Sequence, residues 1–127
     1  MQWVGTHYFA GIDGDWGNDP DALAAALRAD WPEMAVTPAS GDGDLVAYNL
    51  ELGPELGSLH ADGSCIAFKH AEELVIRLAA WWRKRIPDSV ALAVFNDSTA
   101  TPVYVQPGMT AEELAARVAA VEAEWAG

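Results

Sequence analysis

The chain has 127 residues, of which 51% are hydrophobic and 20% are charged, a composition typical of one globular domain rather than a disordered segment. It contains no run near the roughly 20 apolar residues that span a bilayer, and its first residues lack the pattern of a signal peptide, so we expect a cytoplasmic protein. Cys65 is the only cysteine, which excludes an internal disulfide and a thiolate-rich zinc site.

The first half of the chain carries most of the negative charge. Up to Asp62 there are eleven acids and one base, whereas the remaining residues contain eight acids and six bases. This distribution argues against nucleic acid or an anionic membrane as a partner, because like charges repel and a phosphate-neutralising patch is missing. A cationic partner is favoured, and a merely solubilising surface is the alternative.

Several strands and one helix are expected in the first half. Asp19 can cap the free amides of a helix, Pro20 suits its first position, and Pro32 ends it. Alternating apolar and polar residues, interrupted by turn residues, predict strands elsewhere. The predicted segments are a strand at 2–9, a loop at 10–18, strands at 34–37 and 45–52, a break at 53–57, and a hairpin at 58–68 that turns at Asp62-Gly63.

The second half opens with the clearest pattern in the chain. Apolar residues recur at helical spacing over residues 70–86, and Pro87 prevents the helix from continuing. Residues 89–95 are apolar on both faces, which is typical of a strand in the middle of a sheet that is covered above and below. We therefore expect a helix followed directly by a buried strand.

A short strand at 103–106 and a last helix complete the chain. Thr110 and Glu113 have the spacing of a capping box, in which each side chain bonds the other residue's backbone amide. The predicted order is β-α-β-β-β-β-α-β-β-α. It indicates a single α+β domain over residues 1–127, with three helices and a mainly antiparallel sheet of about five to six strands.

One pair of residues suggests nucleophilic chemistry. In the predicted hairpin Leu59 faces Ile66 and His60 faces Cys65, and an imidazole beside a thiol can activate it. A third, orienting group and an oxyanion site are not evident, so a small hydrolase or transferase that uses Cys65 and His60 remains an alternative to a non-enzymatic role.

Neither metal nor cofactor binding is expected. Asp13-Gly-Asp15 resembles the start of a calcium loop, but Gly17 and Ala24 occupy later positions where that loop needs oxygen ligands. The three histidines and single cysteine are too few and too scattered for a zinc site.

Three consecutive basic residues, Arg83 to Arg85, fall in the last turn of the central helix, where cations complement the helix dipole. We expect them to cap that end rather than to bind nucleic acid. Glu73 and Arg77 have the spacing of an ion pair within the helix. Trp82 and Ile86 should face the sheet, with Trp81 at the flank.

The acidic loops form the predicted binding surface. Aspartates beside glycines are common in turns for conformational reasons, but a tryptophan in such a loop can either cover the core or anchor an interface. Acids around an exposed anchor would attract a basic partner. The candidate partner-binding residues are Asp13, Asp15, Trp16, Asp42, Asp44 and Asp62.

Residues 59–114 carry a resemblance to a group of known proteins. The runs LHADGSCI at 59–66, WWRKRIP at 81–87, VALAVFND at 90–97 and VYVQPGMTAEEL at 103–114 are similar in pattern to small actinobacterial proteins that resemble immunity proteins of polymorphic toxin systems. The resemblance implies an inhibitor that binds a cognate toxin. It transfers no binding residue to this chain.

The leading hypothesis is therefore a cytoplasmic immunity protein, not an enzyme, whose acidic loops block the basic active site of a toxin, for example a nuclease or a deaminase. The sequence leaves the oligomeric state open. A self-associating structural domain is the third hypothesis.

Overall fold

The computed structural model describes residues 7–13, 19–39, 46–97 and 101–126, with the backbone alone for 125 and 126. Three helices and an antiparallel sheet form one α+β unit in the predicted order, and the sheet has seven strands where about five to six were predicted. The elements are β1 His7–Asp13, α1 Pro20–Asp30, β2 Ala35–Pro38, β3 Val46–Leu52, β4 Glu55–His60, β5 Cys65–Lys69, α2 Glu72–Arg83, β6 Ala91–Asn96, β7 Val103–Tyr104 and α3 Ala111–Ala126.

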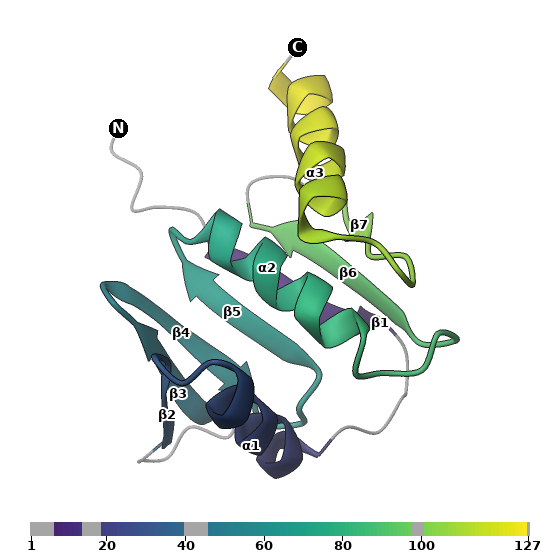
Figure 1. Cartoon of the computed structure of the whole chain (residues 1–127). Helices are drawn as coiled ribbons and strands as arrows, with labels where there is room; N and C mark the ends of the chain where they lie inside the picture. Colours follow the sequence, from purple (N-terminus) through teal and green to yellow (C-terminus); the bar gives the residue numbers. More distant parts are fainter. Residues whose placement is uncertain (1–6, 14–18, 40–45, 98–100, 127) are drawn as a thin grey trace.

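The sheet has the strand order β2-β3-β4-β5-β1-β6-β7 (Figure 1). Strands β2 to β5 form a meander, and β1 lies between β5 and β6. Helix α2 runs across the middle of the sheet, with α1 near the β2–β4 end and α3 near the β6–β7 end (Figure 1). None of the helices in the described ranges is both long and apolar enough to cross a membrane.

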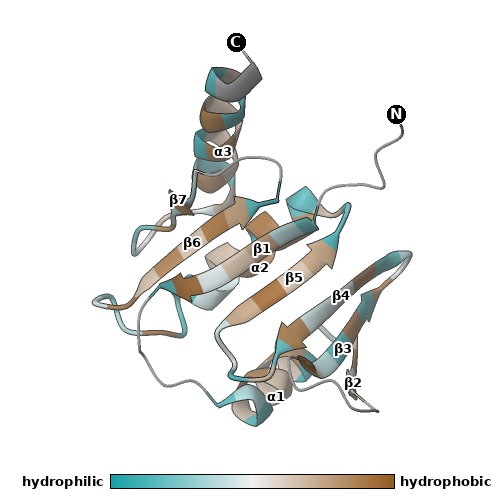
Figure 2. Ribbon diagram, turned by 180° about the vertical axis from the view of Figure 1, so that it is seen from behind, coloured by the Kyte–Doolittle hydropathy of each residue, from teal (hydrophilic) through white to brown (hydrophobic). Residues whose placement is uncertain are grey.

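One hydrophobic core lies between the helices and a single face of the sheet. Side chains at alternate strand positions, such as Leu59, Ile66 and Leu92, are fully buried against the helices. From α2 the largest contribution is Trp82, which is 1% exposed, and Ile86 beyond the helix is also buried, as predicted. This arrangement leaves the other face of the sheet without a helix over it in the described part of the chain (Figure 2).

Local capping signals define two of the helices. The Asp19 carboxylate accepts a hydrogen bond from the Asp21 amide at 2.9 Å, with Pro20 as the first residue of α1. The Thr110 amide donates to the Glu113 carboxylate at 2.9 Å, and the Glu113 amide donates to the Thr110 hydroxyl at 3.1 Å. The predicted capping box is therefore confirmed.

Several strand boundaries differ from the prediction, two of them by three residues or more. Strand β1 continues to Asp13, through residues expected to be a loop, because its backbone pairs with β5 on one side and β6 on the other. Strand β4 begins at Glu55, within the expected break. The connection from β3 needs only two residues, since Gly53 adopts a positive φ of 59° that glycine tolerates.

Arg83 was predicted to cap the end of α2 together with its two basic neighbours, but its side chain has a different role. This side chain is 3% exposed and donates hydrogen bonds to the carbonyls of Val90 at 2.7 Å, Val105 at 3.3 Å and Pro87. The chain after α2 brings these three carbonyls over the helix end, so Arg83 joins α2 to the loops before β6 and after β7 instead of capping the helix in water.

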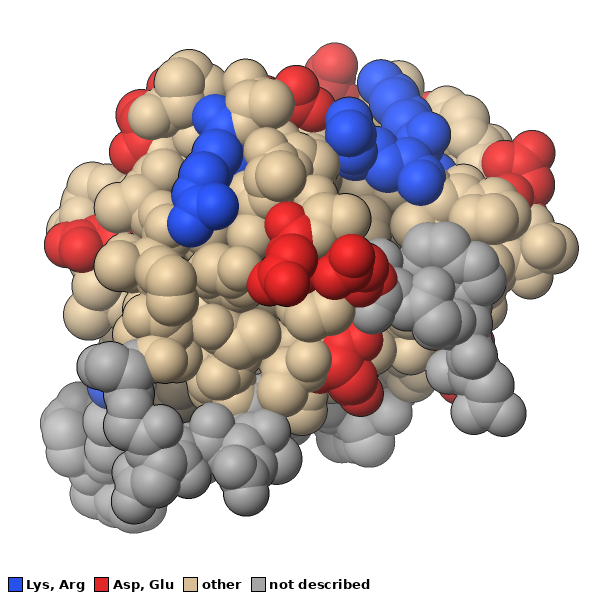
Figure 3. All heavy atoms as spheres, turned by 90° about the horizontal axis from the view of Figure 1, so that it is seen from below, with Lys and Arg blue, Asp and Glu red and all other residues tan. Residues whose placement is uncertain are grey.

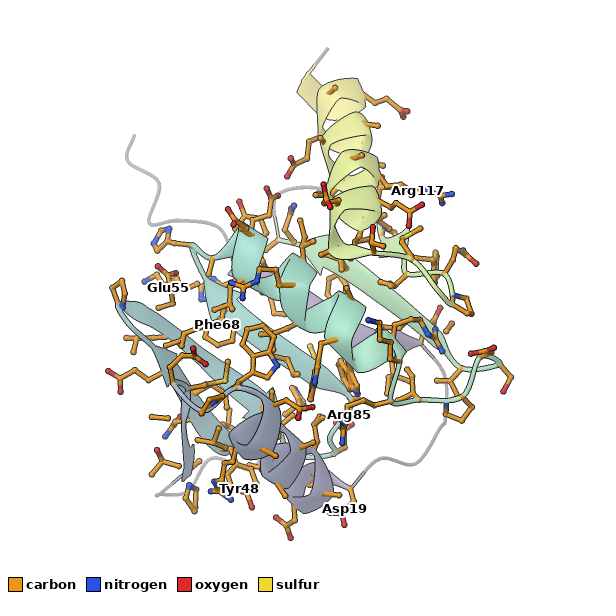
Figure 4. All side chains as sticks on the ribbon, viewed as in Figure 1. Asp19, Tyr48, Glu55, Phe68, Arg85 and Arg117 are labelled. Carbon is orange, nitrogen blue, oxygen red and sulfur yellow. The ribbon has the colours of Figure 1, made fainter. Side chains whose placement is uncertain are left out.

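Arg85 and Arg77 are also bound to other elements. Arg85 donates to the Asp30 carboxylate at 3.0 Å and stacks over the Trp81 ring, so that it reaches from the end of α2 towards α1 (Figure 4). The guanidinium of Arg77 lies 5.1 Å from the centre of the Trp31 ring. The predicted Glu73–Arg77 ion pair does not appear among the close ion pairs of the described residues.

Candidate functional site

The sheet face turned away from the helices is the candidate binding surface, which we call the open face. Its side chains come from the strand positions that alternate with the core positions. Strand β6, expected to be covered on both faces, contributes Ala91, Ala93 and Phe95 to the open face, over which the described residues place no helix (Figure 2). The three described helices all pack on the other face, yet Ala93 is only 4% exposed and Ala91 and Phe95 are half-buried, so neighbouring side chains cover much of β6 on this side.

Aromatic and aliphatic side chains occupy the centre and borders of the open face. The rings of Phe9 and Phe95 stack with their centroids 5.0 Å apart and an angle of 12° between their planes. The Phe95 ring also lies over Gly11, where an added Cβ would be 3.2 Å from the ring. Leu56 is 61% exposed on β4 and Tyr104 is 39% exposed on β7. Such apolar surface next to carboxylates is typical of protein interfaces.

A cavity of about 380 Å³ lies on this face near the end of β1. Its lining includes Asp13, Ser64 and Cys65 beside Phe95 and Tyr104. The Tyr104 hydroxyl donates to the Asp13 carboxylate at 2.9 Å, and this hydrogen bond, together with the negative charge of Asp13, raises the pKa of Tyr104. Tyr104 is therefore a neutral donor at pH 7 that holds the Asp13 carboxylate in place.

Asp62 lies in the turn between β4 and β5. Its carboxylate accepts hydrogen bonds from the Ser64 amide at 3.0 Å and the Ser64 hydroxyl at 2.6 Å, and these bonds hold the pKa of Asp62 below its usual value. The His60 imidazole lies 3.5 Å away and adds a smaller effect in the same direction. Asp62 is thus an ionised, exposed carboxylate in a fixed orientation.

Asp13 and Asp62 lie at the same end of the sheet. The Ile12 amide donates to the Ser64 carbonyl at 2.8 Å, which joins the end of β1 to the turn that carries Asp62. The other predicted binding residues, Asp15, Trp16, Asp42 and Asp44, lie outside the described residues. The structure therefore brings together the two predicted carboxylates that it describes.

Acidic and basic side chains are interspersed at the end of the molecule where α1 lies (Figure 3). Two of the basic groups there already have partners, since Arg28 donates to the Val36 carbonyl at 2.8 Å and Arg85 pairs with Asp30. This end does not present the uninterrupted basic surface that a phosphate backbone needs.

In the β4–β5 hairpin, the side chains of His60 and Cys65 have different interaction partners. Leu59 faces Ile66, as predicted. The Cys65 thiol donates weakly to the Ile66 carbonyl at 3.9 Å, and the His60 imidazole faces Asp62. Burial, and to a lesser extent the charge of Asp62, raises the pKa of the Cys65 thiol to about 11. These contacts do not form a thiolate–imidazole pair.

The described residues contain no group of three or more His, Cys, Asp or Glu side chains arranged to hold a metal ion. The apolar centre of the open face was not predicted as a site. The sequence feature that could have indicated this site is the run of apolar residues on both faces of β6, because the described helices cover only one of these faces.

Comparison of the chain with protein-family models, with curated proteins and with solved structures gave no match.

Proposed function

We propose that this chain is an immunity-type protein of the cytoplasm that binds a protein toxin through the open face and blocks its active site. The observation that supports this proposal is the combination of the half-buried Phe9–Phe95 stack and the exposed Leu56 and Tyr104 with two fixed carboxylates, Asp13 and Asp62, at one end of the same sheet. An apolar centre with a charged rim is the usual anatomy of a protein interface.

In this proposal the carboxylates act as substitutes for an anionic substrate. A toxin that acts on nucleic acid, such as a nuclease or a deaminase, carries basic residues around its active site, and these can bond Asp13 and Asp62. Tyr104 and Ser64 already hold the two carboxylates, so less side-chain freedom is lost on binding. Phe9, Phe95 and Leu56 would exclude water beside the charged contacts.

The test uses the protein encoded by the neighbouring gene, because an antidote is expected beside its toxin. The double variant Asp13→Asn/Asp62→Asn should bind that protein at least about tenfold more weakly than the unchanged chain and with a shallower dependence on salt. Binding is measured by calorimetry at two salt concentrations, and protection by growth of cells that express the toxin.

The matched control is Glu33→Gln/Glu124→Gln, which removes the same charge at exposed positions off the open face. It should change affinity by less than about twofold. Equal loss in both double variants would mean that only net charge matters. Unchanged affinity in Asp13→Asn/Asp62→Asn would show that the open face is not the binding surface.

A further inference from the structure

A second hollow lies on the helical side of the molecule, between α2 and α3. It has a volume of about 540 Å³, within the range of about 300–1,000 Å³ that is usual for ligand pockets. The residues that line this α2–α3 groove are Glu72, Glu73, Ile76, Arg77, Ala111, Glu112, Ala115, Ala119 and Glu122.

The floor of the groove is apolar and shallow. Ala111, Ala115 and Ala119 follow one another at one-turn spacing along α3, beside the stripe of Leu114 and Val118 that packs into the core. From Ala111 to Glu122 the groove follows α3 for about 16 Å, or three turns. Small side chains over this length allow another helix to approach closely.

Carboxylates border this floor. Four glutamates line the groove, and Arg77 is the one lining residue with a positive charge, but its guanidinium is stacked on Trp31, the residue after α1. The nearest basic residue of α3, Arg117, points away from α2 (Figure 4). The four glutamates outnumber Arg77, so the groove has a net negative border.

Glu72 and Glu122 form a carboxyl pair across the two helices. Burial of Glu72, together with its hydrogen bond to Glu122 and the charge of Glu122, raises the pKa of Glu72 to about 7. One oxygen of Glu72, Oε2, is buried and has no hydrogen-bond partner in the described part of the structure. A buried oxygen of this kind needs a proton or a cationic donor.

We propose that the α2–α3 groove binds a cationic amphipathic helix of a partner protein, with its apolar side on the alanine floor and one Lys or Arg between Glu72 and Glu122. This is the helix-in-groove mode of recognition, in which residues at positions i, i+3, i+4 and i+7 enter the groove. The surface lies on the helical side of the sheet, so the inference does not depend on the function proposed for the open face.

Charge also argues against a second copy of this chain as the partner that binds in the α2–α3 groove. The net charge of −12 makes two copies repel each other. Three of the seven basic residues, Arg28, Arg83 and Arg85, donate to carbonyl or carboxylate oxygens of their own chain. The groove needs a partner whose helix carries several cations on the edges of its apolar face.

The probe is a labelled peptide of about 15 residues, made of Leu at groove-facing positions and Lys and Ala elsewhere, which is long enough to form a helix on binding. Fluorescence anisotropy should give a saturable affinity that weakens with salt and with replacement of the lysines by glutamine. Ala115→Arg, which fills the groove and reverses its charge, should weaken binding by at least about tenfold.

Ala120→Arg is the matched control, since it makes the same change at an exposed position of α3 outside the groove, and it should alter affinity by less than about twofold. Glu72→Gln should weaken binding and reduce its dependence on pH. Equal effects of the two arginine variants, or equal binding of the glutamine peptide, would overturn the proposal. Self-association of the chain that Ala115→Arg abolishes would assign the groove to a second copy and would also overturn it.

Discussion

The thiol of Cys65 is held in its neutral form by its surroundings. Its pKa of about 11 results mainly from burial, so at pH 8 far less thiolate is present than for an ordinary cysteine. We expect the folded protein to react with a thiol reagent on the order of a hundredfold more slowly than the chain unfolded in urea.

The reaction rate of Cys65 in the folded and in the unfolded protein is measured from the absorbance of the product that the thiol reagent releases. Similar rates in the folded and unfolded protein would contradict the assignment of a half-buried, neutral thiol and would reopen a nucleophilic role. Cys65→Ser serves as the blank, because Cys65 is the only cysteine.

Gly57 permits a close approach between β4 and β5. A Cβ at this position would overlap the Ala67 carbonyl and lie 2.6 Å from the Phe68 ring, which packs across from Gly57 in the sheet. Gly57→Ala should therefore lower the free energy of unfolding by about 2 kcal/mol or more. Urea denaturation measures the change, and Ser58→Ala in the same strand should change it by less than about 0.5 kcal/mol.

At the scale of elements, Arg83 fixes the end of α2 to two loops. Arg83→Met keeps most of the side-chain volume but leaves the carbonyls of Pro87, Val90 and Val105 without their donor. We expect the free energy of unfolding to fall by about 3 kcal/mol. Lys84→Met, at the exposed neighbouring position, should have an effect below about 0.5 kcal/mol, and a similar effect of both variants would contradict the role of Arg83.

The carboxyl pair between α2 and α3 makes stability depend on pH. The pKa of Glu72 rises from 4.5 to about 7 on folding, so the folded state binds this proton more tightly than the unfolded chain does. The resulting stabilisation is fully present below about pH 4.5 and is lost as the pH rises towards 7. Because Glu72 and Glu122 are only half-buried, solvent screens the pair, and we expect a loss of roughly 1 kcal/mol or less.

Glu72→Gln should flatten this pH dependence, which chemical denaturation at several pH values measures. Glu73→Gln is the control, since it removes the same charge from the first turn of α2 but leaves the pair intact. If both variants kept the slope of the unchanged chain, the pair between Glu72 and Glu122 would not be the titrating group.

For the whole molecule, the features that could be predicted are those that depend on residues close together in the sequence. The caps at Asp19 and Thr110, the inward Trp82 and the pairing of Leu59 with Ile66 all follow from spacing over a few residues, and all are found. The end of β1 and the contacts of Arg83 were predicted wrongly, because their hydrogen-bond partners are distant in the chain.

The candidate site was predictable only in part for the same reason. Asp13 and Asp62 stand out in the sequence as acids in predicted turns, but their placement at one end of the sheet depends on the pairing of β1 with β5. Whether Phe95 is covered depends on which side of the sheet the helices pack, and local spacing does not encode that choice.

The central place of β1 has a consequence for how the chain is made. Tyr8 leaves the ribosome well before its sheet partners, Phe68 and Asn96, are synthesised. The β2–β5 meander can form through local turns, whereas β1 must wait and then enter between β5 and β6, which joins the two parts of the sheet. Pairing over such separations slows folding and leaves strand edges open to aggregation while synthesis continues.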